Sequence, residues 1–270
     1  MGLSVRAIVA SSLIMTAAVA PLAIGTAPDL AQGAGQAQAE TVVINSGSLW
    51  VKGANEVEGL YRIERRADGV FIVLGSDFKT KKGPDLKLVL SPLAADKVKA
   101  KTALDGSLNL GLLKSEKGRQ EFRLPDGTEL TRYRSVLIHC ELKTKLWSAA
   151  ALSEGEVVAY GSSWKKKASN ITGSWEIGRT SSGYELRLGA DFKTKKAPDL
   201  KLVLSPHTTT SAQAKNALAG GLVIAPLGSV KGAQTYQIDA GVDLASFRSV
   251  LIHCELKAKL WGAAELKLIG

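Results

Sequence analysis

Two histidine–cysteine pairs are the residues of this chain best suited to redox or metal chemistry. His139 precedes Cys140, and His253 precedes Cys254. A cysteine thiolate can exchange with disulfides or bind a metal or haem iron, and a neutral imidazole can bind the same ions. The chain has no other cysteine, so a disulfide framework within either pair's segment is excluded.

Each cysteine lies in a segment with the pattern of a β-strand, RSVLIHCELKTKLW at 134–147 and RSVLIHCELKAKLW at 248–261. Alternate side chains of a strand point to opposite faces of its sheet. One face is expected to hold Cys140 with Val136, Ile138 and Leu142, and its equivalent to hold Cys254 with Val250, Ile252 and Leu256. We therefore expect both cysteines to point into an apolar core, where a free cysteine packs as a small hydrophobic residue.

The histidines fall on the opposite, polar face of the same segments. His139 alternates with Ser135 and Glu141, and His253 lies beside Glu255. A solvated histidine is expected on such a face, and one site cannot easily use both neighbours of a His–Cys pair. We keep the two histidines as accessory candidates. Zinc-ligand spacings, phosphate-binding glycine loops and nucleophile elbows are absent, so no metal site and no catalytic residue is predicted.

A disulfide between Cys140 and Cys254 is the alternative that the sequence leaves open. Bridged cysteines need Cα atoms within about 7 Å of each other, and inward-facing positions in two separate cores lie farther apart. The bridge would form only if the two cysteine strands face each other across an interface instead of lining two cores.

The elements that position these residues occur in two copies. DFKTKKGPDLKLVLSP at 77–92 returns as DFKTKKAPDLKLVLSP at 191–206, and the cysteine segments repeat with the same offset of 114 residues. A period of this length corresponds to a whole domain with its own core. Short runs of Val, Ile, Leu and Phe bounded by Gly, Pro or Asp indicate strands. The sequence thus predicts an all-β chain of two tandem β-sandwich-like domains, residues 40–152 and 154–270.

Two segments rich in Ala and Lys interrupt the strand pattern. LAADKVKAKTALDG at 93–106 and TTSAQAKNALAGG at 209–221 have weak apolar periodicity. Each is expected to form a short helix or an ordered loop on the surface.

The N-terminal residues have the pattern of a secretory signal. Arg6 precedes an apolar stretch, and Ala37 and Ala39 suit cleavage after residue 39. Residues 1–39 are therefore expected to be a signal peptide with a small-residue tract, and the mature protein to be secreted or periplasmic. An uncleaved membrane anchor is the alternative, against which Pro21 argues by interrupting the apolar stretch. No later stretch is long and apolar enough to span a bilayer.

The order of these motifs resembles the DM-thirteen electron-transfer domain family. The first copy carries the resemblance through Phe78, Gly83, Pro84, Asp85, Leu86, Leu113, Lys114, Gly118, Tyr133, Ser135, Val136, Ile138 and Cys140. The second copy carries it through Phe192, Pro198, Asp199, Leu200, Gly232, Tyr236, Phe247, Ser249, Val250, Ile252 and Cys254. Together the two matches cover nearly all of the chain after residue 39.

The resemblance implies a β-rich module that works outside the cytoplasm in electron transfer. It implies that Cys140 and Cys254 act as bare thiols or as ligands to a prosthetic group, of which haem is the example. The chain departs from the family pattern where an aromatic residue usually precedes the cysteine, since His139 and His253 stand there. Ala197 also replaces the glycine of the second turn.

Positive charge is the other recurring feature, with a formal net charge of +10. The basic loops comprise Lys79, Lys81, Lys82, Lys193, Lys195 and Lys196, and the turns after them comprise Pro84, Asp85, Pro198 and Asp199. Solvated loops explain such runs by themselves. In an exported protein, the charge indicates an acidic redox protein or an anionic envelope component as partner, and not nucleic acid.

These observations predict an exported tandem-domain protein with a redox role through one cysteine in each domain. The alternative is a non-redox envelope or cell-surface binding module, in which the cysteines only fill cores. An enzymatic activity of its own is the third option. The recurring Asp85 and Asp199 suggest it, but a Pro-Asp turn explains both, and no base–nucleophile pair can be placed.

Overall fold

The computed structural model describes residues 40–269. The predicted signal peptide, residues 1–39, lies outside the described residues. Within that range the chain forms strands and two short 3-10 helices, η1 (Leu130–Arg132) and η2 (Leu244–Ser246), and no α-helix. None of its described helices has the length and apolar character needed to cross a membrane.

The strands fall into two sets with the same order. The first set is β1 (Val42–Gly47), β2 (Trp50–Lys52), β3 (Val57–Glu58), β4 (Tyr61–Arg66), β5 (Gly69–Leu74), β6 (Lys79–Thr80), β7 (Leu86–Ser91), β8 (Leu108–Leu112), β9 (Gln120–Arg123), β10 (Ser135–Cys140) and β11 (Lys145–Ala151). The second set is β12 (Glu156–Gly161), β13 (Trp164–Lys166), β14 (Ile171–Thr172), β15 (Trp175–Thr180), β16 (Gly183–Leu188), β17 (Lys193–Thr194), β18 (Leu200–Ser205), β19 (Leu222–Pro226), β20 (Gln234–Asp239), β21 (Ser249–Cys254) and β22 (Lys259–Glu265).

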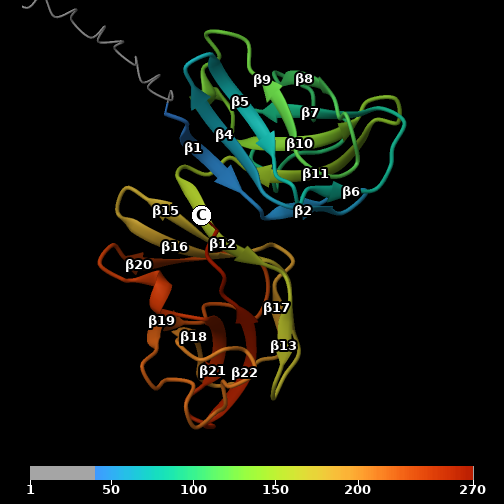
Figure 1. Cartoon of the computed structure of the whole chain (residues 1–270). Helices are drawn as coiled ribbons and strands as arrows, with labels where there is room; N and C mark the ends of the chain where they lie inside the picture. Colours follow the sequence, from blue (N-terminus) through green and yellow to red (C-terminus); the bar gives the residue numbers. More distant parts are fainter. Residues whose placement is uncertain (1–39, 270) are drawn as a thin grey trace, which may run out of the picture. The chain divides into compact units, whose positions relative to one another are not determined.

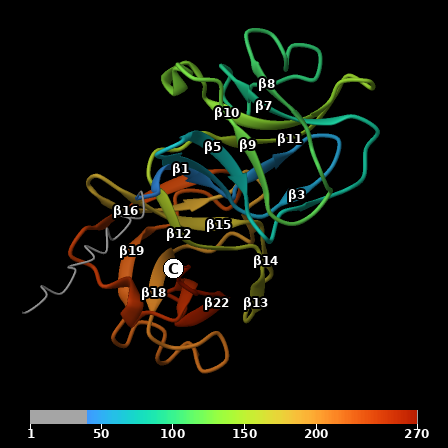
Figure 2. The same cartoon turned by 45° about the horizontal axis from the view of Figure 1, so that its top comes forward.

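Each set folds into a sandwich of two antiparallel sheets. In the first copy a four-stranded sheet, β1-β4-β5-β9, faces a five-stranded sheet, β2-β11-β10-β7-β8 (Figures 1 and 2). The second copy repeats this order as β12-β15-β16-β20 and β13-β22-β21-β18-β19. A small two-stranded sheet, β3-β6 or β14-β17, completes each copy. The predicted all-β fold of two tandem sandwich-like domains is confirmed.

The cysteine strand is the centre of each five-stranded sheet. β10 lies between β7 and β11, with Cys140 opposite Leu86 on one side and Lys145 on the other. β21 lies in the same way between β18 and β22. A central strand is held by hydrogen bonds on both edges, so the position of its last residue is well defined.

The main core of each copy lies between its two sheets. In the first copy Cys140 packs there with Ile63, Ile72 and Leu88, among other apolar side chains. The second core is built in the same way around Cys254. Each of these clusters contains residues of one copy only, so the two sandwiches bury their apolar faces separately.

A second, smaller core lies on the outer face of each five-stranded sheet. The segment 93–106 forms an ordered loop of successive turns and not a helix. It places Ala95, Val98 and Ala103 against Leu137 of β10 and other residues of that face. The equivalent loop covers β21 in the second copy. The five-stranded sheet is therefore buried on both faces.

Candidate functional site

Both cysteines are the last residues of their central strands. Cys140 and Cys254 are each 0 % exposed, and each thiol is unbridged. They point into the main cores, on the faces that strand alternation predicts. Since they belong to different cores, the structure favours two separate thiols over the cross-domain disulfide.

The surroundings of the first thiol are closely packed. A Cβ atom added at Gly83 would lie 2.7 Å from Leu86 Cδ2 and 3.2 Å from Trp147 Cη2. Both residues belong to the same core as Cys140. The glycine of the Pro-Asp turn thus allows the turn to close over the end of the sheet beside the cysteine.

The second copy packs this corner differently. Ala197 stands where the first copy has Gly83, and it packs against the core. Trp261 is half-buried and donates its indole N–H to the carbonyl oxygen of Lys195 at 3.2 Å. The indole N–H of Trp147 is buried with no partner among the described residues. The copy that carries the methyl group of Ala197 is thus the one in which the equivalent tryptophan, Trp261, is partly exposed, whereas Trp147 is buried.

The residues around the thiols do not fit a haem. A haem needs an open pocket lined by the sulfur that binds its iron, and Cys140 and Cys254 are fully enclosed by apolar side chains. No group of three His, Cys, Asp or Glu side chains between residues 40 and 269 is placed to hold a metal ion. A prosthetic group at these thiols would require the core to open.

The two histidines are buried, contrary to the expectation that they are solvated. His139 is 1 % exposed and His253 is 3 % exposed. The covering loops at 93–106 and 209–221 lie over the outer face of the sheet, which strand alternation alone cannot reveal. The prediction of solvated histidines was therefore wrong.

Among the described residues, only the ring of His139 is hydrogen-bonded to the backbone of its covering loop. His139 donates a hydrogen bond from Nε2 to the carbonyl oxygen of Ala100 at 3.2 Å. Burial lowers the pKa of His253, while the carbonyl of Ala214 acts in the opposite direction. Each histidine ring lies on the face of the sheet opposite its neighbouring cysteine. The histidines are therefore not placed to assist the thiols.

The Pro-Asp turn and the cysteine strand are linked by ionic contacts. Lys87 of β7 pairs with Glu141 and lies 3.7 Å from the carboxylate of Asp85. Asp85 also accepts a hydrogen bond from the backbone N–H of Leu142 at 3.2 Å. The hydrogen bond from Lys87 to Glu141 raises the pKa of this lysine. Equivalent ion pairs join Lys201 to its two acidic neighbours in the second copy.

The leucines after the cysteines are exposed, contrary to the expectation that they face inward. Leu142 is 74 % exposed and Leu256 is 75 % exposed. The strands end at the cysteines, and the following four residues form the turn of a hairpin. Thr144 has a φ of 46° and Ala258 has a φ of 42°. The last residue of each turn therefore adopts the left-handed conformation, although it is not a glycine.

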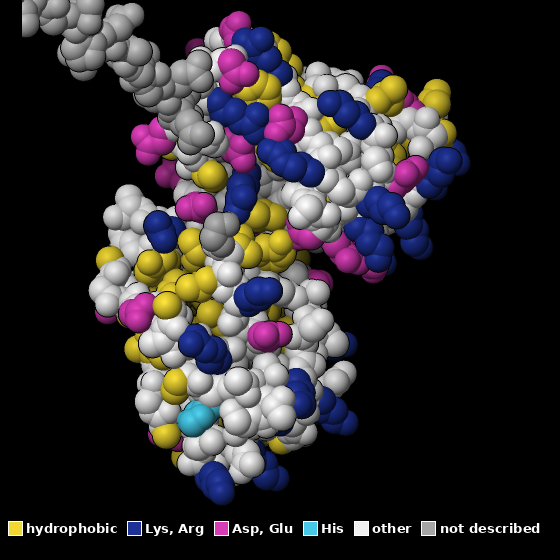
Figure 3. Space-filling model, viewed as in Figure 1, with side chains coloured by type: hydrophobic (Ala, Val, Ile, Leu, Met, Phe, Trp, Pro, Cys, Tyr) yellow, Lys and Arg dark blue, Asp and Glu magenta, His cyan; other side chains and the backbone are white. Residues whose placement is uncertain are grey.

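The predicted basic loops lie at the same end of each copy as these hairpins. Lys79 is in β6, and Lys81 and Lys82 follow it as exposed residues. Figure 3 shows dark blue basic side chains gathered around the position of β6, with acidic side chains beside them. In the second copy Lys193, in β17, begins the equivalent loop.

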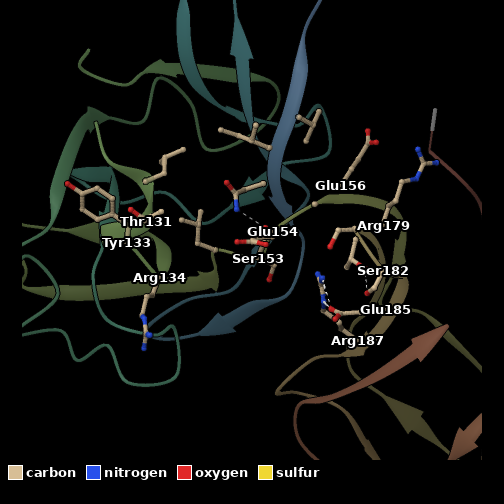
Figure 4. Close-up of a pocket in the computed structure, with 18 of the residues that line it drawn as sticks. Thr131, Tyr133, Arg134, Ser153, Glu154, Glu156, Arg179, Ser182, Glu185 and Arg187 are labelled. Carbon is tan, nitrogen blue, oxygen red and sulfur yellow. Dashed lines mark hydrogen bonds and ion pairs between the residues drawn. The ribbon is translucent and has the colours of Figure 1, made fainter. Parts of the chain in front are cut away.

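The largest cavity described is a cleft of about 1120 Å³ that the sequence did not reveal (Figure 4). Its charged lining residues are Arg65, Arg134, Glu154, Glu156, Arg179, Glu185 and Arg187. Arg187 pairs with Glu185 at 2.9 Å, so part of this charge is internally neutralised. Of the residues singled out from the sequence, Tyr133 lines the cleft, whereas the cysteines, the histidines and the lysines of the basic loops do not.

Comparison with known proteins identifies the two copies. A sequence model of a protein family described as "Electron transfer DM13" matches residues 50–152 and 163–266. Each matched segment contains one of the two cysteines. No match was found among curated proteins or among solved structures.

Proposed function

Because the chain belongs to the electron transfer DM13 family, we propose that it transfers electrons outside the cytoplasm, with Cys140 and Cys254 as the residues responsible. The observation that carries the proposal is the equivalent place of the two thiols. Each is unbridged and ends the central strand of its five-stranded sheet. Packing in the core would be satisfied by an apolar side chain at this position. It does not by itself explain why a thiol stands there in both copies.

A buried thiol needs an opening before it can react. An enclosed cysteine is inert toward exchange and oxidation, so the strand end at Cys140 must separate from its neighbours. The hairpin that follows Cys140 is exposed, which makes it the short segment whose movement would uncover the sulfur. In a bare-thiol step, one thiol gives one electron to an oxidising partner protein and one proton to water and becomes a thiyl radical. A reducing partner protein returns this radical to the thiol by giving back one electron, while water returns the proton.

The decisive experiment combines spectroscopy with substitution of the thiols. The protein purified from its native compartment is expected to show no Soret band, since the cores do not fit a haem. Replacing both Cys140 and Cys254 by Ser is expected to abolish electron transfer to an oxidising partner while the fold is kept. Ser135→Ala, on the opposite face of the same strand, is the control. Electron transfer at the unchanged rate by the double variant would refute a role for the thiols.

The extracytoplasmic part of the proposal has its own test. Signal-peptidase cleavage after Ala39 would leave Glu40 as the first residue. N-terminal sequencing of the protein recovered from its native cells is expected to find Glu40. A chain that keeps Met1 and stays in the cytoplasmic fraction would contradict export.

A second candidate function is binding without redox chemistry. The observation that favours it is the complete burial of both thiols among apolar side chains, as in structural cysteines. In that case Cys140 and Cys254 can be replaced by Ala with a loss of stability only, and the exposed ends of the two domains carry the function.

A further inference from the structure

The two segments that are nearly identical in both copies lie side by side in the fold. Residues 77–92 and 134–147 each differ from their counterparts at one position, whereas the loop 93–106 differs from its counterpart at most positions. β7 from the first segment pairs with β10 from the second along its whole length. Shared packing in the core accounts for the buried positions of these segments, but it does not account for the exposed ones.

Five lysines and one leucine that are exposed and kept in both copies form one surface, which we call the basic tip; the exposed Glu141 and Glu255 lie in the same hairpins. In the first copy it comprises Lys79, Lys81, Lys82, Leu142, Lys143 and Lys145, all exposed. In the second copy it comprises Lys193, Lys195, Lys196, Leu256, Lys257 and Lys259, again all exposed.

Direct contacts join the two segments of the tip. The hydrogen bond from the N–H of Leu142 to Asp85 connects the hairpin to the turn that follows the lysine loop. In the second copy Trp261 of the hairpin strand β22 donates to the carbonyl oxygen of Lys195 in that loop. The lysines of the loop and of the hairpin therefore share one end of the sandwich.

The lysines of the tip form no direct ion pairs within residues 40–269, although Glu56, whose pKa is lowered mainly by Lys52 and also by Lys81, lies nearby. The nearby carboxylates Asp85 and Glu141 are both paired with Lys87. None of the five tip lysines in either copy forms an ion pair with another residue of the described chain. Clustered free ammonium groups at one end favour a partner with closely spaced negative charges.

The leucine decides between kinds of anionic partner. At 74 % and 75 % exposure, Leu142 and Leu256 stand at the apex of tight turns among the lysines, and not in a groove. A polysaccharide or a soluble polyanion offers charge but no apolar interior. A bilayer offers headgroup phosphates to lysines and an acyl boundary to an apolar side chain at the same depth.

We propose that the basic tip of each domain docks on the surface of an anionic phospholipid bilayer. The lysines contact the lipid phosphates, and Leu142 and Leu256 enter the interface between headgroups and acyl chains. This interaction is independent of the electron-transfer proposal, because no cysteine takes part in it. A variant with both cysteines replaced by Ala would bind bilayers as the wild-type protein does.

The test is sedimentation of residues 40–270, which contain both complete sandwiches and their cores, with large unilamellar vesicles. Binding is expected to vesicles of phosphatidylcholine with phosphatidylglycerol, to weaken with salt, and to be absent with phosphatidylcholine alone. Each lysine near an anionic surface contributes about fivefold in affinity. Replacing Lys79, Lys81 and Lys82 by Ser is therefore expected to weaken binding roughly a hundredfold.

A second variant isolates the apolar contribution. Replacing Leu142 and Leu256 by Ser is expected to weaken vesicle binding roughly tenfold, since two buried side chains are lost from the interface. The same variant is expected to bind heparin, a soluble polyanion, as the wild type does. Val223→Ser, at another exposed apolar position, is the control and is expected to change neither.

A control variant with three other lysines replaced shows whether binding depends on the basic tip or only on the net charge of the protein. Lys97, Lys99 and Lys101 are exposed on the covering loop, and their replacement by Ser removes the same charge at a different place. If this control weakens vesicle binding as much as the loss of the tip lysines, the basic tip is not a site. If the leucine variant binds vesicles unchanged, the partner is a polyanion and the bilayer assignment is wrong. Melting temperatures verify that each variant is folded.

Discussion

His139 Nε2 lies 3.2 Å from the carbonyl oxygen of Ala100 and ties the covering loop 93–106 to β10. In the second copy the equivalent residues are His253 and Ala214. There, neither ring nitrogen of the histidine has a hydrogen-bond partner in the described chain. Both histidines are buried under a covering loop, but only the loop of the first copy is hydrogen-bonded to its histidine.

The first prediction is a pH dependence that comes from His253. Burial is the main cause that lowers its folded-state pKa below the usual value of about 6.5. The groups facing it act in both directions, since Glu255 and Asp199 raise the pKa and Lys201 lowers it. Below pH 6.5 the unfolded chain binds the proton more readily, so stability is complete above pH 6.5 and falls until the folded pKa is reached.

Urea unfolding of the wild type and of His253→Leu between pH 8 and pH 5 checks this. The difference in unfolding free energy between them should change by up to about 1.4 kcal/mol for each pH unit of the window. At pH 8, His139→Leu is expected to cost more than His253→Leu, because only His139 loses a hydrogen bond. Parallel curves for the wild type and His253→Leu would show that His253 does not titrate differently on folding.

The second prediction concerns two glycines with positive φ. Gly59 has a φ of 99°, and a Cβ added there would lie 2.6 Å from the backbone N and Cα of Phe78. Gly118 has a φ of 84°, but nothing lies within 4 Å of its added Cβ. Gly118→Ala is expected to cost about 1 kcal/mol of stability through strain alone. Gly59→Ala is expected to cost several times more, since backbone must move.

Thermal unfolding of the two alanine variants measures this difference. Gly173 and Gly232 are the counterparts in the second copy, with φ values of 103° and 85°. The same order of effects is expected there. Equal losses of stability in Gly59→Ala and Gly118→Ala would contradict the prediction. They would mean that the backbone between β3 and β6, beside Phe78, can shift without a loss of stability.

The third prediction is slow reaction of both thiols. Cys140 and Cys254 are fully buried, so a thiol reagent should label neither quickly in the native protein and both after denaturation. Cys140→Ala is expected to cost about 1 to 2 kcal/mol through lost packing. A mass measured without reductant should match the dithiol. A mass two hydrogens lower, with one peptide linking both strands, would show that the cysteines are bridged.

The fourth prediction is independent folding of the two halves, because each main core uses residues of one copy only. Residues 40–152 and 154–270, the domain boundaries expected from the sequence, are expressed separately. Each is expected to give a near-UV circular dichroism spectrum of a folded protein and a cooperative thermal transition. A half that stays unfolded while the whole chain folds would show that the cores depend on each other.

The sequence by itself determined the repeat, the strand-rich class and the inward direction of the cysteines. These features follow from local patterns. A 114-residue offset is visible in the letters, and the alternation through Val136, Ile138 and Cys140 assigns one face of a strand to the core. The family resemblance also depended on such local motifs, and the match to residues 50–152 and 163–266 confirmed it.

Only the tertiary structure decided what lies on the other face of the cysteine strand and where that strand ends. His139 is buried because the segment 93–106, distant in sequence, folds back over it, and alternation does not say whether a second face is covered. Leu142 is exposed because hydrogen bonding across β7, β10 and β11 ends at Cys140, so the next residue but one is in a turn. Pairing between distant strands sets both outcomes, and no local pattern contains that information.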